Sequence, residues 1–403
     1  MIKKLLLSTL LLSTFSSFAY AEEKTEKNTK PSFSGVNAYT RKLSLNNSTV
    51  SLGGYFDTEY VFPFGKNSFF DQHRLVLQAS SLYNDRLFFN TEIEIEHGGI
   101  SDENKGEVAI EQAFLDYKLI NGLNLRTGIV LITLGRLNVY HDSDLRQTTS
   151  RPLFNRYIVP TTWSEPAAGL YGSISPDDSW ELSYDLYVSQ GLIDKISEED
   201  GIKEAKPSLF SDNNNDKALS GRIGFSPFLG LEAGLGGYVG KVDKADSKYL
   251  GMGVADFKYS LGAFELLGEG GMVFMNPLEI KVEAENKDQK ETVKTIKNPM
   301  YGYYGEARYK LAPDFLKMSF LGEGFDNPTI TLFGRVDQID TDMTILNGND
   351  KMQFTLGFNY RPITNVVFKF EYQMNKNLEA LLKNDPSKQT LKDQFLISAA
   401  AGF

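Results

Sequence analysis

Hydrophobic and polar residues alternate along most of the chain after Val50, in runs of strand length separated by turn residues. In one of the first runs, Leu52 and Phe56 alternate with Ser51 and Asp57. Side chains of a β-strand point alternately to opposite faces of its sheet, so a period of two is the signal of a strand with one apolar and one polar face. The pattern therefore predicts an all-β protein.

The alternation predicts about sixteen strands. They lie near residues 50–60, 72–82, 87–96, 106–118, 123–131, 166–175, 180–190, 217–226, 229–242, 250–260, 263–275, 301–311, 328–339, 350–361, 364–374 and 391–403. The run near 106–118 is ambiguous, because the polar residues Gln112 and Asp116 share the parity of the apolar Ile110.

The connections between these runs alternate between short and long. Short joins with turn residues occur at 83–86, 121–122, 176–178, 227–228, 261–262 and 361–362. Long polar joins occupy 61–71, 132–165, 191–216, 276–300 and 375–390. Short turns at one end and long loops at the other are typical of a transmembrane β-barrel. The join at 312–327 departs from this pattern, because it should be short, and it indicates a small insertion.

Two architectures contain many alternating strands. A soluble sandwich or propeller buries its apolar faces against each other, whereas a membrane barrel turns them to lipid and leaves no strand edge unpaired. The barrel is favoured because charges lie opposite the apolar faces, no repeat of blade length is visible, and tyrosines such as Tyr60 and Tyr360 lie near strand ends. We therefore predict a transmembrane antiparallel β-barrel of about 16 strands, with a long third loop folded inward.

The first residues have the features of a secretory signal peptide. Lys3 and Lys4 precede a short apolar stretch, and Ala19-Tyr20-Ala21 offers a small-x-small cleavage site. We expect residues 1–21 to be removed on export and the remaining chain to reside in the bacterial outer membrane.

The rest of the chain divides into two parts. Residues 22–48 are polar and show no helical stripe, so we expect a mobile leader, with a short helix or plug piece as the alternative. Residues 49–403 are expected to form the barrel. The terminal Phe403 is in phase with the apolar face of the last run and resembles the assembly signal of bacterial outer-membrane proteins.

Composition and charge narrow the class of protein. The chain has no cysteine, so its stability does not come from disulfides. The formal net charge of -10 argues against non-specific binding to nucleic acid. After the signal peptide, the sequence has no apolar run of the roughly 18 residues that a transmembrane helix needs. Strands remain the only elements that can cross a membrane.

If the apolar faces point to lipid, the charged positions of the same strands point into the lumen. The basic positions are Arg74, Arg126, Arg222, Lys258, Arg308, Lys310, Arg335 and Lys369. The acidic positions, which are more numerous, are Asp57, Glu59, Glu92, Glu94, Glu111, Glu181, Asp185, Glu232, Glu265, Glu269, Glu306, Asp337 and Glu371. They either pair with one another across a wet lumen or gather by sign on opposite walls, which gives a transverse field at a constriction.

The longest join, Ile132 to Trp163, is the third long loop and is rich in arginine. A barrel of this width leaves an aqueous channel, which an inward-folded loop narrows. The candidate constriction residues are Arg136, His141, Asp142, Asp144, Arg146, Arg151 and Arg156. The arginines either form an anion-attracting ladder or anchor the loop to wall carboxylates such as Glu92, Glu94 and Glu111. We interpret His141 as structural, because no second histidine lies at metal-ligand spacing.

One stretch resembles a known family. The matching residues are Ile110-Glu111-Gln112-Ala113-Phe114-Leu115-Asp116-Tyr117, Arg126-Thr127-Gly128, Gly135, Asn138, His141, Arg151-Pro152, and Ile158 to Pro166, followed by Gly169 and Gly172. Over roughly residues 106–172 the chain is similar to the porins typified by the phosphate-selective porins O and P. The resemblance implies a sixteen-stranded, usually trimeric outer-membrane porin whose third loop folds inward. It does not imply phosphate selectivity, which in the family's namesakes depends on a dense lumenal array of arginine and lysine.

The leading functional hypothesis is a porin, a water-filled diffusion channel for small hydrophilic solutes, anions among them. Its expected partners are outer-membrane lipid, the solutes or ions, and two further copies in a homotrimer. The alternatives are a surface-interaction or structural barrel that uses the loops 191–216 and 276–300, a barrel enzyme such as a phospholipase or protease, and a transporter with an N-terminal plug. We predict no catalytic residues, metal or cofactor, since neither His73 nor His97 lies in a nucleophile motif.

Overall fold

The structure is a computed structural model of the whole chain. It describes residues 41–45, 48–100, 106–176, 179–209, 212–282, 292–296, 299–343, 349–377 and 392–403. The predicted signal peptide and most of the predicted leader, residues 1–40, lie outside the described residues.

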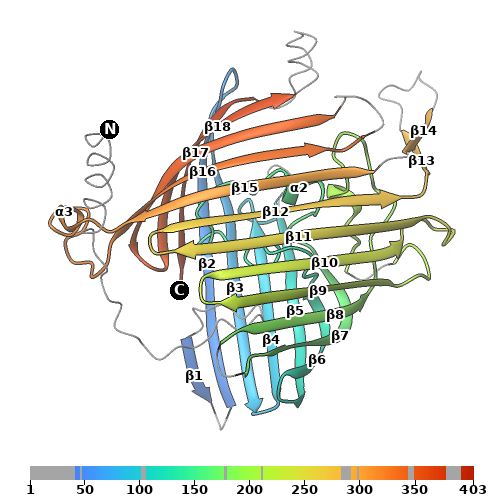
Figure 1. Cartoon of the computed structure of the whole chain (residues 1–403), viewed down its shortest axis with the longest axis horizontal. Helices are drawn as coiled ribbons and strands as arrows, with labels where there is room; N and C mark the ends of the chain where they lie inside the picture. Colours follow the sequence, from blue (N-terminus) through green and yellow to red (C-terminus); the bar gives the residue numbers. More distant parts are fainter. Residues whose placement is uncertain are drawn as a thin grey trace, which may run out of the picture. The chain divides into compact units, whose positions relative to one another are not determined.

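Sixteen antiparallel strands close into one barrel (Figure 1). They are β2 (Ser48–Pro63), β3 (Phe69–Asn84), β4 (Leu87–Glu96), β5 (Glu107–Ile120), β6 (Leu123–Leu131), β7 (Ser164–Ile174), β8 (Glu181–Ser189), β9 (Ala218–Phe228), β10 (Leu231–Lys241), β11 (Tyr249–Leu261), β12 (Phe264–Met275), β15 (Met300–Leu311), β16 (Thr329–Asp340), β17 (Asp350–Ile363), β18 (Val366–Asn377) and β19 (Gln394–Gly402). Each pairs with its neighbours in the chain, and β19 pairs with β2 from Gln394↔Pro63 to Gly402↔Tyr55. The predicted all-β barrel is confirmed, and each predicted run overlaps one of these strands.

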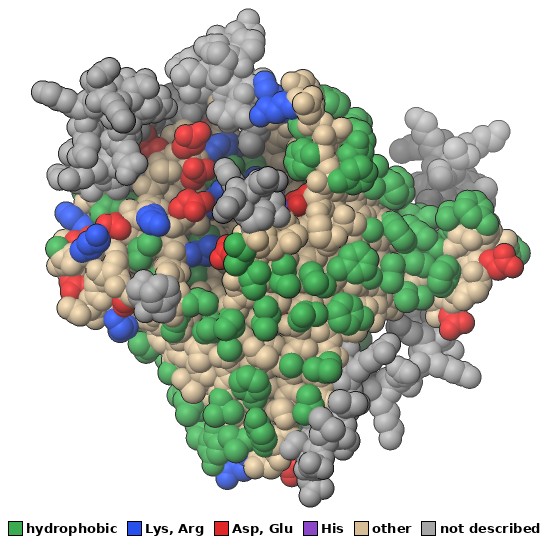
Figure 2. All heavy atoms as spheres, turned by 180° about the vertical axis from the view of Figure 1, so that it is seen from behind, with side chains coloured by type: hydrophobic (Ala, Val, Ile, Leu, Met, Phe, Trp, Pro, Cys, Tyr) green, Lys and Arg blue, Asp and Glu red, His purple; other side chains and the backbone are tan. Residues whose placement is uncertain are grey.

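The alternation along the strands separates an apolar exterior from a polar interior, as predicted. Leu52 and Phe56 of β2 point outward and are exposed, whereas Ser51 and Asp57 point inward and are buried. Figure 2 shows hydrophobic side chains spread over one face of the barrel, with charged side chains towards the edges of the view. An apolar outer band is what a barrel in hydrocarbon requires.

The ambiguous run near 106–118 contains a β-bulge. The pairing of β4 with β5 shifts between Glu92↔Gln112 and Ile93↔Ile110, which leaves Glu111 unpaired in the ladder. A bulge adds one residue to one strand and so reverses the phase of its side chains. Glu111 and Gln112 are therefore both buried inside, and Ile110 points outward.

The strand β1 (Arg41–Leu45) lies within the segment that we expected to be a mobile leader. It pairs with the beginning of β2 through Leu43↔Val50 and its neighbours. Within the expected leader 22–48, residues 41–45 therefore form a strand that continues the ladder of β2.

The connections are long at one end of the barrel and short at the other. One exception is the join after β15, which holds the helix α3 (Asp314–Lys317) and its exposed side chains Phe315 and Phe320. This is the small insertion that the sequence indicated. On the opposite end, the join after β12 contains the hairpin of β13 (Leu278–Val282) and β14 (Thr292–Ile296). Among the described residues, no helix is long and apolar enough to cross a membrane.

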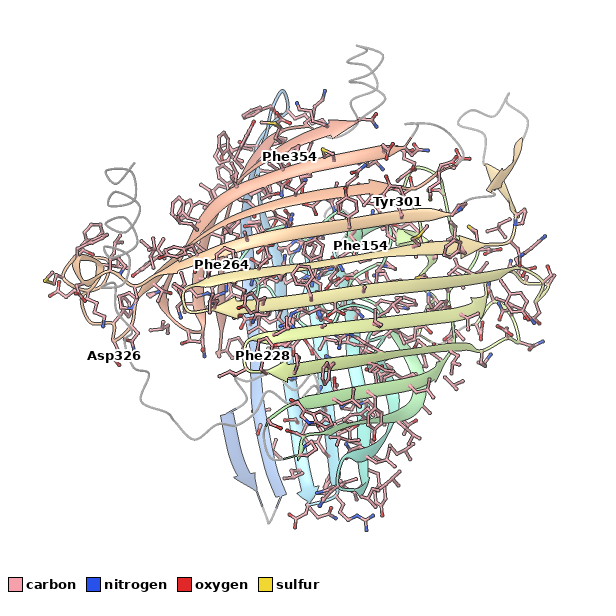
Figure 3. All side chains as sticks on the ribbon, viewed as in Figure 1. Phe154, Phe228, Phe264, Tyr301, Asp326 and Phe354 are labelled. Atoms are coloured by element: carbon pink, nitrogen blue, oxygen red, sulfur yellow. The ribbon has the colours of Figure 1, made fainter. Side chains whose placement is uncertain are left out.

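The third long loop folds into the barrel, where it forms a hydrophobic core with the wall. It carries the helix α2 (Phe154–Tyr157), which packs against β15 and β16 (Figure 1). Phe154, labelled in Figure 3, is fully buried with Ile158 and Trp163 of the loop against Val254 and Tyr304 of the wall. This core fixes the loop in the lumen, since burying large apolar side chains stabilises it by roughly 1.5–3 kcal/mol each.

The apolar exterior leads to a first prediction. Leu235 lies in the middle of β10 and is 69% exposed on the outer face. We expect Leu235→Arg to lower the free energy of unfolding in phospholipid vesicles by about 2–4 kcal/mol, because the guanidinium enters hydrocarbon. Urea titration of folding into vesicles measures the change.

The matched control is Leu229→Arg. Leu229 is fully exposed in the turn between β9 and β10, and the same charge there should cost at most about 1 kcal/mol. Equal costs at both positions would contradict a lipid-facing wall.

Candidate functional site

The base of the inward loop is closed by Asn138. Its side-chain amide donates hydrogen bonds to the carbonyl oxygens of Ile132 (2.7 Å) and Trp163 (2.9 Å), and its side-chain oxygen accepts one from the Trp163 backbone amide (2.9 Å). The two ends of the loop are also joined directly by the Ile132 amide and the Trp163 carbonyl, at 3.0 Å. A single buried asparagine thus holds the entry and exit of the loop together.

Wall carboxylates from three strands accept hydrogen bonds from the loop. They are Glu269 of β12, Asp337 of β16 and Glu371 of β18. Their donors are the Asn155 side chain, the Leu153 backbone amide and the Thr149 backbone amide, each at 2.9 Å. A buried backbone amide that is not paired within a helix or strand needs another hydrogen-bond acceptor. Much of the acidic surplus in the lumen therefore serves to hold the loop.

Two basic wall residues, on the strands β16 and β18 that also carry Asp337 and Glu371, donate hydrogen bonds to the loop. Lys369 Nζ donates to the Ser143 carbonyl at 2.6 Å. Arg335 Nη1 donates to the Ser150 carbonyl at 3.0 Å and to Thr148 Oγ1 at 3.1 Å. Both wall side chains are fully buried, so they are not open to a solute.

Two of the candidate loop arginines are structural anchors. Arg136 forms an ion pair with Glu232 of β10. Arg146 is buried and donates to the carbonyls of His141 (2.8 Å) and Thr149 (2.6 Å), within its own loop. The interpretation of the arginines as loop anchors describes these two residues, although the wall partner is Glu232 rather than Glu92, Glu94 or Glu111.

The other two loop arginines are partly exposed. Arg151 donates to the Thr161 carbonyl and to Thr162 Oγ1, and Arg156 lies over the ring of Tyr157 at 5.5 Å. In the described part of the structure neither is paired with a carboxylate at salt-bridge distance. Among the described residues they are the two arginines of this loop that are neither buried nor paired with a carboxylate.

His141 and the two loop aspartates lie in the buried part of the loop. His141 Nε2 lies 2.5 Å from Glu111 Oε1 and 3.5 Å from Asp142, and Nδ1 lies 2.9 Å from the Asn138 carbonyl. The geometry agrees with the structural interpretation of His141. Asp144 is fully buried, and burial, followed by the negative charge of Asp142, raises the pKa of its carboxyl to about 7.

The wall formed by β3 and β4 carries a row of carboxylates. Arg74 of β3 contacts Glu94 (2.7 Å) and Glu96 (2.6 Å) of β4. Glu92 accepts a hydrogen bond from Gln112 at 2.6 Å. One arginine faces several carboxylates, so this wall has an acidic surplus.

The remaining lumenal arginines are paired along the wall. Arg126 binds Asp116 in a fork with distances of 2.7 and 2.8 Å, and Arg222 binds Asp256 with distances of 2.9 and 2.6 Å. Arg308 contacts Glu265 and Glu306, each at 2.5 Å. Of the two interpretations of the lumenal charges, pairing describes these residues.

The second inward element was not foreseen. The join between β8 and β9, one of the long polar joins of the sequence, contains the short helix η2 (Lys203–Ala205) and buries Leu192, Ile196 and Ile202 in the same core as the third loop. The signal for this was present as isolated apolar residues in a polar stretch.

The sequence also shows no sign that His73 and His97 lie close together, because they belong to different segments. In the structure both contact Asp71, His73 at 3.3 Å and His97 at 2.8 Å. Only the pairing of β3 with β4 reveals their proximity.

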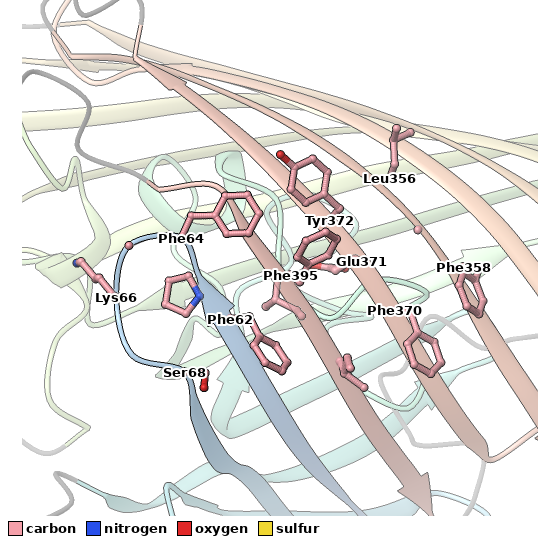
Figure 4. Close-up of a pocket in the computed structure, with 15 residues that line it drawn as sticks. Phe62, Phe64, Lys66, Ser68, Leu356, Phe358, Phe370, Glu371, Tyr372 and Phe395 are labelled. Carbon is pink, nitrogen blue, oxygen red and sulfur yellow. The ribbon is translucent and has the colours of Figure 1, made fainter. Parts of the chain in front are cut away.

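A large apolar pocket lies on the outer face of the barrel and not in the lumen. It has a volume of about 860 Å³ and is lined by Phe62, Phe64, Leu356, Phe358, Phe370 and Phe395 (Figure 4). Its walls come from β2, β17, β18 and β19, beside the seam where the barrel closes. The pocket therefore takes no part in the channel.

Comparison with known proteins supports the fold. No family model matches the chain. An uncharacterised protein of Aquifex aeolicus is 28% identical over 360 residues, which cover 84% of this chain and 79% of that protein.

Solved structures share the architecture at low sequence identity. The outer-membrane channel DcaP of Acinetobacter baumannii has a TM-score of 0.55 at 13% identity and matches 89% of this chain and 99% of its own. The anion-selective porin from Comamonas acidovorans has a TM-score of 0.53 at 14% identity, with 88% and 100% covered. The trimer form of OmpT, an outer-membrane protein of Vibrio cholerae, has a TM-score of 0.52 at 13% identity, with 89% and 100% covered. The chain therefore has a porin-like fold.

The buried carboxyl of Asp144 leads to a second prediction. A carboxyl whose pKa is raised in the folded state costs stability once the pH exceeds its unfolded value of about 3.9, and the cost is complete above about pH 7. Asparagine stays neutral throughout. We therefore expect Asp144→Asn to raise the unfolding temperature relative to the unmodified protein at pH 8 and to change it little at pH 4, as measured by circular dichroism in detergent.

The control is Asp243→Asn, in the exposed loop after β10. Burial alone would raise the pKa of Asp243, but hydrogen bonds from Ser247 and Lys248 outweigh it and lower the pKa. The sign is therefore reversed, and this substitution should destabilise the protein more at pH 8 than at pH 4. The same pH response in both variants would show that Asp144 is not held in a charge-excluding site.

Proposed function

We propose that the protein is an outer-membrane porin, a diffusion channel for small hydrophilic solutes. The observation that carries the proposal is the third loop, which folds into a closed barrel with a charged interior and an apolar exterior. A barrel of sixteen strands is wide enough to leave an aqueous path, and a loop in its lumen narrows this path without blocking it.

The charge preference of the channel depends on which basic side chains are already engaged in holding the third loop. Arg136, Arg146, Arg335 and Lys369 are committed to holding the loop. Arg151 is one of the two partly exposed arginines of the loop, and the charges that act on it include Arg74 and Glu94 of the β3–β4 wall. We infer that Arg151 attracts anions against the acidic surplus of the wall.

Arg151→Ala should therefore lower the anion-to-cation permeability ratio. The measurement is the reversal potential of single channels in a planar bilayer under a salt gradient, at low ionic strength where screening is weak. Arg146→Ala is the matched control: it removes an arginine of the same loop whose side chain hydrogen-bonds only within that loop, so it should lower thermal stability and leave the preference in place.

A folded, heat-modifiable protein that does not conduct would contradict the channel itself. An unchanged ratio in Arg151→Ala, with conductance intact, would assign Arg151 to loop structure instead.

We further propose that the channel is a homotrimer. The similar structure of OmpT is of a trimer form, and the aromatic pocket beside the closing seam offers an apolar surface suited to a neighbouring barrel. Light scattering of the detergent complex, corrected for bound detergent, should give the mass of three chains. The mass of one chain in mild detergent would contradict the proposal.

A further inference from the structure

Two of the three histidines of the chain meet at the loop end of the barrel, around one carboxylate. Asp71 Oδ2 lies 3.3 Å from His73 Nδ1, and Asp71 Oδ1 lies 2.8 Å from His97 Nδ1. The two imidazole rings are 5.7 Å apart between centroids. Asp71 and His73 belong to β3, and His97 directly follows β4. Three ligand-type side chains are thus placed together by strand pairing.

Two more carboxylates border the cluster from β2. The pairing of β2 with β3 shifts between Asp57↔Arg74 and Glu59↔Asp71, so that Gln72 and His73 lie in a bulge. Asp57, Glu59 and His73 offer ligand atoms within 4.8 Å of one another. The bulge aims His73 at both groups of carboxylates.

Asp57, beside the cluster, has an oxygen without a hydrogen-bond partner. It is 1% exposed, and its Oδ1 has no hydrogen-bond partner among the described residues. A buried carboxylate oxygen without a partner costs stability, and a bound cation is one way to satisfy it.

The backbone at His97 is also unusual. With φ at 49°, it is one of two non-glycine residues with positive φ in the described part of the chain. Such conformations persist where the surroundings require them, and they gather at ligand sites. At this position the conformation turns the imidazole back towards Asp71.

The ligand set indicates the type of ion. Two imidazoles with carboxylates suit zinc and related divalent transition metals, whereas magnesium and calcium prefer oxygen ligands alone. The ligand atoms of Asp71, His73 and His97 lie within 4.8 Å of one another. Tetrahedral zinc at about 2.1 Å from each ligand needs them about 3.4 Å apart. Small rotations of the side chains close this gap.

We propose that Asp71, His73 and His97 bind one divalent transition-metal ion of the zinc type at the lumen entrance, with Asp57 and Glu59 as flanking carboxylates. The three ligands lie outside the third loop, on β3 and directly after β4. The flanking carboxylates Asp57 and Glu59 interact electrostatically with Arg146 of that loop, so the test of the site uses readouts other than conductance.

Zinc alone, titrated into the refolded, tag-free full chain in detergent, tests the site by calorimetry. We expect one ion per chain. His73→Gln and His97→Gln should each weaken binding by more than about tenfold, the lower bound seen even for second-sphere changes at metal sites. Glu92→Gln, a lumenal carboxylate of β4 outside the cluster, should bind zinc as the unmodified protein does. Magnesium in hundredfold excess should not compete.

Absence of binding, or equal binding by the histidine variants, would overturn the proposal and leave the cluster as a hydrogen-bonded strand end. Heat modifiability on gels confirms that each variant is folded. If a variant fails to fold, copper(II) bound to the unmodified chain provides a second test: its electron paramagnetic resonance spectrum should show two imidazole nitrogens, and a spectrum with oxygen ligands only would overturn the site. Neither readout involves conductance, so failure here is distinct from failure of the channel.

Discussion

The structure depends on one constraint, which is that strands in hydrocarbon must pair every backbone amide and carbonyl within the protein. An open sheet leaves two edges, and the pairing of β19 with β2 removes both. Closure then fixes which face of each strand meets lipid, because a shift by one residue would turn every charge outward. The alternation that runs through the chain is the sequence counterpart of this constraint.

Closure also creates a space that the chain must fill or leave wet. On one side the third loop and the join after β8 fill it with a hydrophobic core that includes Phe154, Trp163 and Ile202. On the other side the loop meets buried carboxylates and cations such as Glu371 and Lys369, which hold its free backbone groups. Most lumenal charges therefore have a structural partner, and Arg151, which hydrogen-bonds within its loop but is paired with no carboxylate in the described part of the chain, is the residue to which we assign the charge preference.

The strands and the inward loop could be predicted from the sequence, but the wall residues that bind the loop could not. The strands are set by a local period of two, which is visible in any single run. The partners depend on the circumferential position of each strand, which the order of residues does not contain. Arg136 illustrates this: its arginine chemistry was evident, but its partner Glu232 lies on β10, far along the chain. The extra strand β1 was missed because its alternation is short, with only Leu43 and Leu45 as apolar residues, and it follows a polar stretch.

The β-bulges interrupt the alternation at positions where polar side chains contact one another. In β5 the bulge at Glu111 turns an additional carboxylate inward, where it contacts His141 of the third loop. In β3 the bulge at Gln72 and His73 turns an imidazole towards Asp57 and Asp71. A strict alternation allows only every second residue to reach the lumen, so a phase shift is the means by which neighbouring positions on one strand can both face it. Breaks in the period of a barrel strand are therefore the positions to inspect first for polar groups with a specific role.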